Sequence, residues 1–174
     1  MIITRRRVLE TGGSILAGLL VGRLSATAAD VVEITMQGKE DGSHVWYDPT
    51  GIHIQPGQTI RWINRDAGNS HTVTAYHPAN LDRPLRMPKA AKPFDSDYLL
   101  PGESFSATFT EPGVYDYYCV PHEHAGMVGR IVVGTPAPHG WIETADAKGD
   151  LPEIALAAFP SVEEIIKKGI VRPA

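Results

Sequence analysis

The chain has 174 residues, of which 43% are hydrophobic and 21% are charged, and its formal net charge is −4. This composition excludes an intrinsically disordered chain, a collagen-like chain and a membrane protein with several spans. The mild acidic excess also argues against nucleic-acid binding, because an acidic surface repels phosphate. The single cysteine, Cys119, excludes a disulfide framework within the chain.

The first 28 residues have the three-part layout of an export signal. Three arginines at residues 5–7 precede an apolar run at 12–22, and small residues at 26–28 provide a site for signal peptidase. The consecutive arginines resemble a twin-arginine signal, which is read by a receptor. The apolar run is shorter than the roughly 20 residues that span a membrane, so we expect cleavage and not a retained anchor. Residues 1–28 are therefore left out of the fold prediction.

Short β-rich runs separated by turn residues occupy the middle of the chain. Residues 58–64 and 103–109 show the clearest alternation, with Ile60 and Trp62 on one face of the first run. Similar runs lie at residues 31–36, 51–55, 71–76, 114–119 and 128–133. Glycine and proline are frequent between them and supply turns. Short strands with little helical periodicity predict an all-β fold, an antiparallel Greek-key β-sandwich over residues 29–134.

Two segments depart from this strand pattern. Residues 77–102 contain five prolines and little alternation, which predicts a long ordered loop of the kind that is often functional. Residues 135–174 form a C-terminal extension with two predicted short helices, at 151–159 and 161–168. Ser161 is placed to cap the second helix. Val162, Ile165 and Ile166 give that helix an apolar face, which we expect to pack on the sandwich.

Residues 117–129 carry the strongest chemical signal. They read Tyr-Tyr-Cys-Val-Pro-His-Glu-His-Ala-Gly-Met-Val-Gly, so that Cys119, His122 and Met127 lie in one short loop between two predicted strands. A thiolate, an imidazole and a thioether form a soft donor set that selects copper, whereas structural zinc usually takes two or more thiolates. The set needs a second imidazole, for which His71 is the best candidate because it lies where a loop enters a strand.

The Cys-Val-Pro-His motif at residues 119–122, followed by Met127, resembles the ligand loop of the blue-copper (cupredoxin) family. The likeness is to plastocyanin, pseudoazurin, amicyanin and halocyanin. Flanking segments at residues 54–62, 101–105, 112–115 and 126–129 resemble the same family. The resemblance covers about residues 45–134, and it implies a cupredoxin-like sandwich with one type 1 copper per chain.

For the metal, the resemblance implies a trigonal set of His71, Cys119 and His122, with Met127 as a weak axial ligand. It also implies that His122 lies at the surface, where redox partners dock transiently and exchange electrons. Family members often have Asn directly after the first ligand histidine, where this chain has Thr72. His124 is an additional loop histidine that could replace His122 as ligand, although an exposed histidine without a metal role is the preferred interpretation.

The sequence thus predicts an exported, mononuclear type 1 copper protein that shuttles single electrons between partner proteins and is not an enzyme. We expect a monomer that lies in the periplasm or another extracytoplasmic compartment, that does not bind nucleic acid and that touches a membrane only if its signal is retained. Two alternatives stay open: a copper carrier or storage protein, and a subunit of a multicopper oxidoreductase. Multicopper enzymes usually have a histidine next to the ligand cysteine, whereas Tyr118 and Val120 flank Cys119 here.

Overall fold

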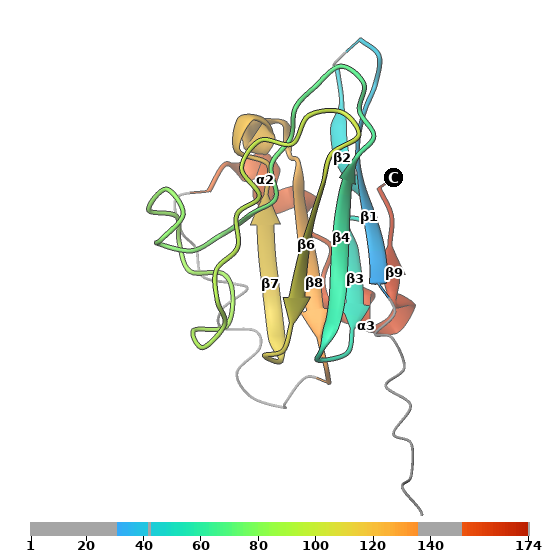
Figure 1. Cartoon of the computed structure of the whole chain (residues 1–174). Coiled ribbons are helices and arrows are strands. Elements are labelled where there is room, and N and C mark those ends of the chain that lie inside the picture. Colours follow the sequence, from blue (N-terminus) through green and yellow to red (C-terminus); the bar gives the residue numbers. More distant parts are fainter. Residues whose placement is uncertain (1–30, 42, 136–150, 174) are drawn as a thin grey trace, which may run out of the picture.

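The computed structural model describes residues 31–41, 43–135 and 151–173. The predicted export signal at residues 1–28 lies outside the described residues, as do residues 136–150 of the extension. The described part of the chain forms two β-sheets that pack against each other (Figure 1). This arrangement confirms the predicted all-β sandwich.

Each sheet combines strands from distant parts of the chain. The first has the order β2-β1-β4-β6 and consists of β1 (Val31–Gly38), β2 (Val45–Asp48), β4 (Gln58–Asn64) and β6 (Ser104–Phe109). The second has the order β5-β7-β8-β3-β9 and consists of β3 (Gly51–Ile54), β5 (Thr74–Ala75), β7 (Gly113–Tyr118), β8 (Val128–Val133) and β9 (Ile170–Val171).

Both sheets are mixed, which corrects the expectation of purely antiparallel sheets. β1 pairs with β4 in parallel, and β3 pairs with β8 in parallel, while the remaining pairs are antiparallel. The reason is that the chain passes from the first sheet to the second between β2 and β3. Strands joined through such a crossing are not hairpin neighbours, so nothing forces them to run in opposite directions.

The core between the sheets follows the alternation predicted for β4 and β6. Ile60 and Trp62 are fully buried, whereas Arg61 between them is exposed. The Trp62 ring packs against four other aromatic rings, those of Phe94, Phe105, Phe109 and Tyr117. Because such interiors are close-packed, this core gives the loops at the ends of the sandwich a rigid base.

The 77–102 segment lies between β5 and β6 and contains no helix or strand of its own. Backbone hydrogen bonds tie it to the sandwich. Ala75 N–H donates to the carbonyl of Phe94 at 2.9 Å, and Leu99 N–H donates to the carbonyl of His71 at 2.8 Å. The second bond places part of this segment directly beside a predicted metal ligand.

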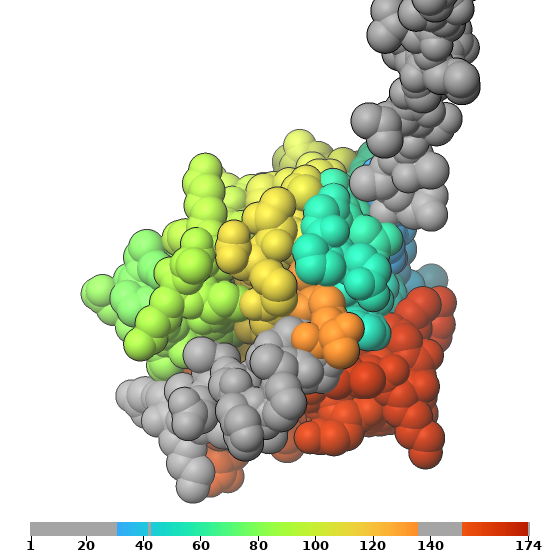
Figure 2. Space-filling model, turned by 90° about the horizontal axis from the view of Figure 1, so that it is seen from below, coloured from blue at the N-terminus to red at the C-terminus, as the bar shows by residue number. Residues whose placement is uncertain are grey.

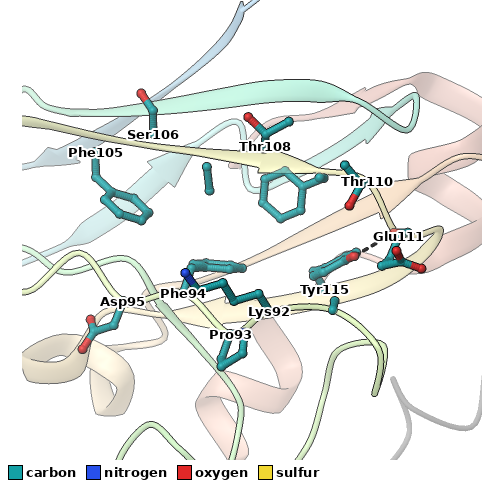
Figure 3. Close-up of a pocket in the computed structure, with 13 residues that line it drawn as sticks. Lys92, Pro93, Phe94, Asp95, Phe105, Ser106, Thr108, Thr110, Glu111 and Tyr115 are labelled. Carbon is teal, nitrogen blue, oxygen red and sulfur yellow. Dashed lines mark hydrogen bonds between the residues drawn. The ribbon is translucent and has the colours of Figure 1, made fainter.

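A groove of about 450 Å³ lies between this segment and the β6 edge of the sandwich. Figure 3 shows Phe105 on one side of the groove and Phe94 and Tyr115 on the other. Phe94 also stacks on Trp62, with 5.9 Å between the ring centroids, so it closes the edge of the core. None of the predicted ligands lines the groove, which is therefore separate from the candidate metal centre.

The C-terminal extension folds back onto the second sheet. It contains α2 (Glu153–Ala158) and α3 (Val162–Lys168), as predicted, and the Ser161 hydroxyl accepts a hydrogen bond from Glu164 N–H at 3.1 Å. Ile165 is fully buried, and β9 pairs with β3. Figure 2 shows the extension, in red, covering one side of the sandwich. Among the described residues, no helix has the length and apolar character needed to cross a membrane.

A buried ion cluster joins the extension to the sandwich. Asp116 of β7 is fully buried and pairs with Arg86 at 2.8 Å and with Arg130 at 2.7 Å. Arg130 Nη1–H also donates to the carbonyl of Pro160 at 2.9 Å. Both guanidinium groups lie over the Phe159 ring, 5.2 Å and 4.9 Å from its centroid. Since a buried carboxylate needs such pairing, this cluster fixes the extension relative to β7 and β8.

Candidate metal centre

The predicted ligands lie in two neighbouring loops at one end of the sandwich. Cys119 directly follows β7, His122 lies in the 3-10 helix η1 (Val120–Ala125), and Met127 precedes β8. His71 lies just before β5, and β5 is hydrogen-bonded to β7 in the second sheet. Because β5 and β7 are adjacent, the two loops are brought side by side.

The ligand loop is closed by its own backbone. Cys119 N–H donates to the carbonyl of Met127 at 3.0 Å, and Met127 N–H donates to the carbonyl of His122 at 3.1 Å. Gly126 has a φ of 80°, a left-handed conformation that glycine adopts without strain. The loop can therefore reverse direction within a few residues and return to β8.

His71 Nδ1, His122 Nδ1 and Cys119 Sγ form a small triangle. The two nitrogens are 3.2 Å apart, and the sulfur lies 3.6 Å from His71 Nδ1 and 3.4 Å from His122 Nδ1. A point equidistant from these corners would lie about 2.0 Å from each, which is the length of a metal–nitrogen bond. Within the described part of the chain, His71, Cys119 and His122 form a group of side chains that could hold a metal ion.

Met127 and His124 stand in different relations to this triangle. Met127 is fully buried and belongs to the same core cluster as Cys119. Its role as the fourth ligand stays a prediction. His124 is exposed and does not belong to the group that could hold a metal ion. The geometry therefore favours His122 over His124 as the loop histidine that faces the centre.

Asp66 is a site residue that the sequence analysis missed. His71 Nε2–H donates to Asp66 Oδ2 at 3.0 Å, which leaves Nδ1 free on the side of the triangle. Asp66 also accepts hydrogen bonds from Gly68 N–H and Asn69 Nδ2–H, both at 2.9 Å. A carboxylate in this position fixes the tautomer and the orientation of a ligand histidine.

Thr72 connects the two ligand loops. Its N–H donates to Cys119 Sγ at 3.3 Å, and its hydroxyl accepts a hydrogen bond from Val120 N–H at 2.9 Å. The hydroxyl lies 2.9 Å from that of Thr74, and the Thr72 carbonyl accepts from Tyr47 Oη–H at 2.5 Å. Threonine thus supplies the cross-loop hydrogen bonds at the position where family members often have asparagine.

Comparison with known protein families shows which family the chain belongs to. The family described as "Copper binding proteins, plastocyanin/azurin family" matches residues 32–134, which is more than half of the chain. The chain belongs to this family. Its members carry electrons at copper and are not enzymes, and copper is the cofactor of the site described above.

Individual members of the plastocyanin/azurin family agree with this assignment. A chloroplast plastocyanin from Tetradesmus obliquus is 36% identical over 129 residues, which cover 74% of this chain and 81% of the relative. A plastocyanin from Prochlorothrix hollandica is 32% identical and covers 68% of this chain and 85% of the relative. A solved Sinorhizobium pseudoazurin has a TM-score of 0.58 at 26% identity, covering 80% of this chain and 98% of its own. The predicted cupredoxin resemblance is confirmed.

The donor set in this family member fits copper. One thiolate and two imidazoles form the soft, nitrogen-containing set that copper prefers. Burial raises the pKa of the Cys119 thiol to about 11, against the opposing hydrogen bond from Thr72 N–H. The thiol proton therefore has to be displaced when a cation binds, as is usual for thiolate ligands.

Both histidines of the triangle favour the neutral form. Burial lowers the pKa of His71, although the hydrogen bond and charge of Asp66 oppose this change. Burial also lowers the pKa of His122, and the neighbouring His71 adds to the effect. A neutral imidazole offers a free nitrogen to a metal, so these histidines need no deprotonation at pH 7.

Proposed function

We propose that the protein carries single electrons at one type 1 copper, held by His71, Cys119 and His122 with Met127 as a weak axial ligand. The triangle of two imidazole nitrogens and one sulfur supports this proposal, because that donor set is typical of blue-copper electron-transfer sites. Bound copper would supply a one-electron Cu(II)/Cu(I) couple.

The residues around the triangle keep its donor atoms in place. Asp66 holds the His71 ring, and the Thr72 N–H donates to the Cys119 sulfur. His71 and Cys119 are fully buried, so water is excluded from that side of the site. Since close-packed side chains resist displacement, we expect little rearrangement when the charge at the site changes. The hydrogen bond to the sulfur and the axial thioether of Met127 are expected to tune the potential.

We infer that redox partners dock transiently over His122. Its side chain is partly exposed, and the adjoining Pro121 and Ala125 are exposed. Leu99 pairs with His71, and the next residue, Leu100, is 58% exposed. A small apolar surface beside a ligand suits the weak redox encounters that bury less than about 1,200 Å² in total. We expect the protein to act as a monomer.

We further infer that residues 1–28 direct export through the twin-arginine route, which places the protein in the periplasm or an equivalent compartment. Export of a chain with one free cysteine is consistent with metal ligation, which protects the thiol in an oxidising compartment. Replacing Arg5, Arg6 and Arg7 by lysine should leave the unprocessed precursor inside the cell. Unchanged processing and export of this variant would contradict the inference.

A redox-cycling experiment distinguishes this function from its alternatives. The copper-loaded protein is oxidised and reduced repeatedly in the presence of a Cu(I) chelator, and copper per chain is measured after each cycle. An electron carrier retains one copper, whereas a copper carrier loses it to the chelator. Retention of two or more coppers per chain would instead indicate a multicopper protein.

Met127→Leu is the matched variant for the axial ligand, because it removes the thioether and keeps the apolar bulk. We expect it to retain the thiolate–copper absorption and to have a higher reduction potential, since Cu(II) loses a donor. An unchanged potential would remove Met127 from the proposed ligand set.

A further inference from the structure

Glu123 is a buried carboxylate within the ligand loop. It follows His122 in η1, yet only 5% of the residue is exposed. Tyr76 Oη–H donates to Glu123 Oε1 at 2.7 Å, and Arg83 forms an ion pair with the same oxygen. A carboxylate is rarely buried unless it is paired in this way. The proposed electron transfer at the triangle does not itself use these contacts.

Arg83 brings the 77–102 segment into the cluster. Its guanidinium lies 5.6 Å from the centroid of the Tyr76 ring and 5.2 Å from that of Tyr118, distances at which cations are attracted to aromatic rings. The two tyrosine rings are stacked with their centroids 4.4 Å apart. Tyr118 immediately precedes Cys119. One cluster therefore joins the 77–102 segment, the end of β7 and the ligand loop.

Glu123 lies in the part of the loop where backbone hydrogen bonds link His122 and its neighbour to the returning chain. The Glu123 carbonyl accepts a hydrogen bond from Gly126 N–H at 2.9 Å, and the His122 carbonyl accepts one from Met127 N–H at 3.1 Å. A short 3-10 helix has poor hydrogen-bond geometry and is weak by itself. Because its own backbone hydrogen bonds hold η1 only weakly, the inward-pointing, ion-paired side chain of Glu123 can hold the helix in place.

We propose that Glu123 is a positioning residue for His122 and that it fastens the ligand loop through Arg83 and Tyr76. This inference rests on the proposed function, in which His122 binds copper. Cu(II) depends more than Cu(I) on nitrogen ligands, so a loosened His122 disfavours the oxidised state. Loss of the Glu123 contacts therefore raises the reduction potential. In the metal-free protein, the same loss makes η1 more mobile.

The test compares Glu123→Gln with Arg83→Gln, and the exposed Glu163→Gln serves as control. Two quantities are measured: amide exchange of Gly126 in the metal-free protein and the reduction potential of the copper-loaded protein. Both cluster variants should exchange Gly126 about tenfold faster or more, as expected for a lost hydrogen bond to a charged group. Both should also raise the potential, while the control changes neither quantity.

Tyr76→Phe is a milder variant that keeps the stacked ring and removes only the hydroxyl donor. It should shift both quantities in the same direction as Glu123→Gln, by a smaller factor. Because its shape is almost unchanged, it gives a result even if a charge variant folds poorly. Wild-type exchange of Gly126 in Tyr76→Phe and in both charge variants would overturn the proposal.

A purely electrostatic role of Glu123 predicts a different pattern. Removing its negative charge would raise the potential, but removing the positive charge of Arg83 would lower it. Potential shifts of opposite sign, with unchanged Gly126 exchange, would overturn the positioning role and leave the copper site intact. Absence of thiolate–copper absorption in the unmodified protein would instead contradict the proposed function itself.

Discussion

The two histidines of the triangle are held in different ways. His71 is fully buried, and a direct hydrogen bond from its ring to Asp66 fixes its orientation. His122 is partly exposed, and among the described residues the hydrogen bonds to its ring involve only Nδ1. Its position depends on η1 and on the contact that Glu123, a residue of that helix, makes with Tyr76. Under the proposed function this difference separates two tasks: the buried histidine would fix the geometry, and the partly exposed one would offer electrons a path to the surface.

Removing each ring should have the largest effect. His71→Gly and His122→Gly are both expected to lose the thiolate–copper absorption, because each leaves an incomplete donor set. Added imidazole should restore it in His122→Gly, where the missing ring opens toward solvent, and not in His71→Gly, whose site is closed. A titration with imidazole followed by visible absorption measures the difference. Equal recovery of the absorption in both variants would contradict the proposed difference between the two histidines.

Asp66→Asn weakens the direct support of the buried histidine. We expect its affinity for Cu(II) to fall about 10–100-fold, as is usual when the partner of a metal-bound histidine is lost. If Cu(I) binding is unchanged, each tenfold loss raises the reduction potential by about 59 mV. Voltammetry and chelator competition measure both quantities, and Asp82→Asn is the exposed control. A lowered potential would show that Asp66 does not act through His71.

The pH dependence of the metal-free protein should report the burial of both rings. The pKa values of His71 and His122 are lowered in the folded state, mainly by burial. The unfolded chain therefore binds more protons as the pH falls below about 6.5, and the free energy of unfolding decreases. Urea unfolding between pH 8 and pH 5 should show this decrease. A free energy of unfolding that increases as the pH falls from 8 to 5 would contradict this prediction.

A second loss of stability should follow at lower pH. Burial alone would raise the pKa of Asp66, but hydrogen bonds from Asn69, Gly68 and His71 outweigh it and leave this pKa lowered. Its stabilising effect is present above the unfolded value of about 3.9 and disappears as the pH falls through the folded value. Asp66→Asn should remove this second step and leave the first one in place.

His124→Ala should have the smallest effect. His124 is exposed and lies outside the triangle, so its removal should leave the absorption and the reduction potential close to those of the unmodified protein. Paramagnetic resonance of the oxidised protein checks this directly. A large change in the copper signal would mean that the loop presents His124 to the metal.

Much of the fold was predictable because alternation is a local signal. β4 and β6 each present apolar side chains to one face, and Ile60 and Trp62 lie where that pattern places them. Strand direction was not predictable, since alternation is the same in parallel and antiparallel pairs. β9 was also missed, because a two-residue strand depends on its partner β3 and has no pattern of its own.

The candidate ligands were predictable because their donor types are rare together, whereas their supports were not. Asp66 lies five residues before His71, and only the folded turn brings its carboxylate to the ring. Glu123 lies in the ligand motif itself, but its spacing does not reveal that it points inward to Tyr76. Acidic residues are common in exposed loops, so neither carried a signal in the sequence.

The visible absorption spectrum of the copper-loaded, oxidised protein tests the central claim most directly. We expect one copper per chain and an intense thiolate-to-Cu(II) charge-transfer band that disappears on reduction and is absent in Cys119→Ser. A colourless protein with bound Cu(II), or a band that persists in Cys119→Ser, would contradict a site in which Cys119 binds the metal beside His71 and His122.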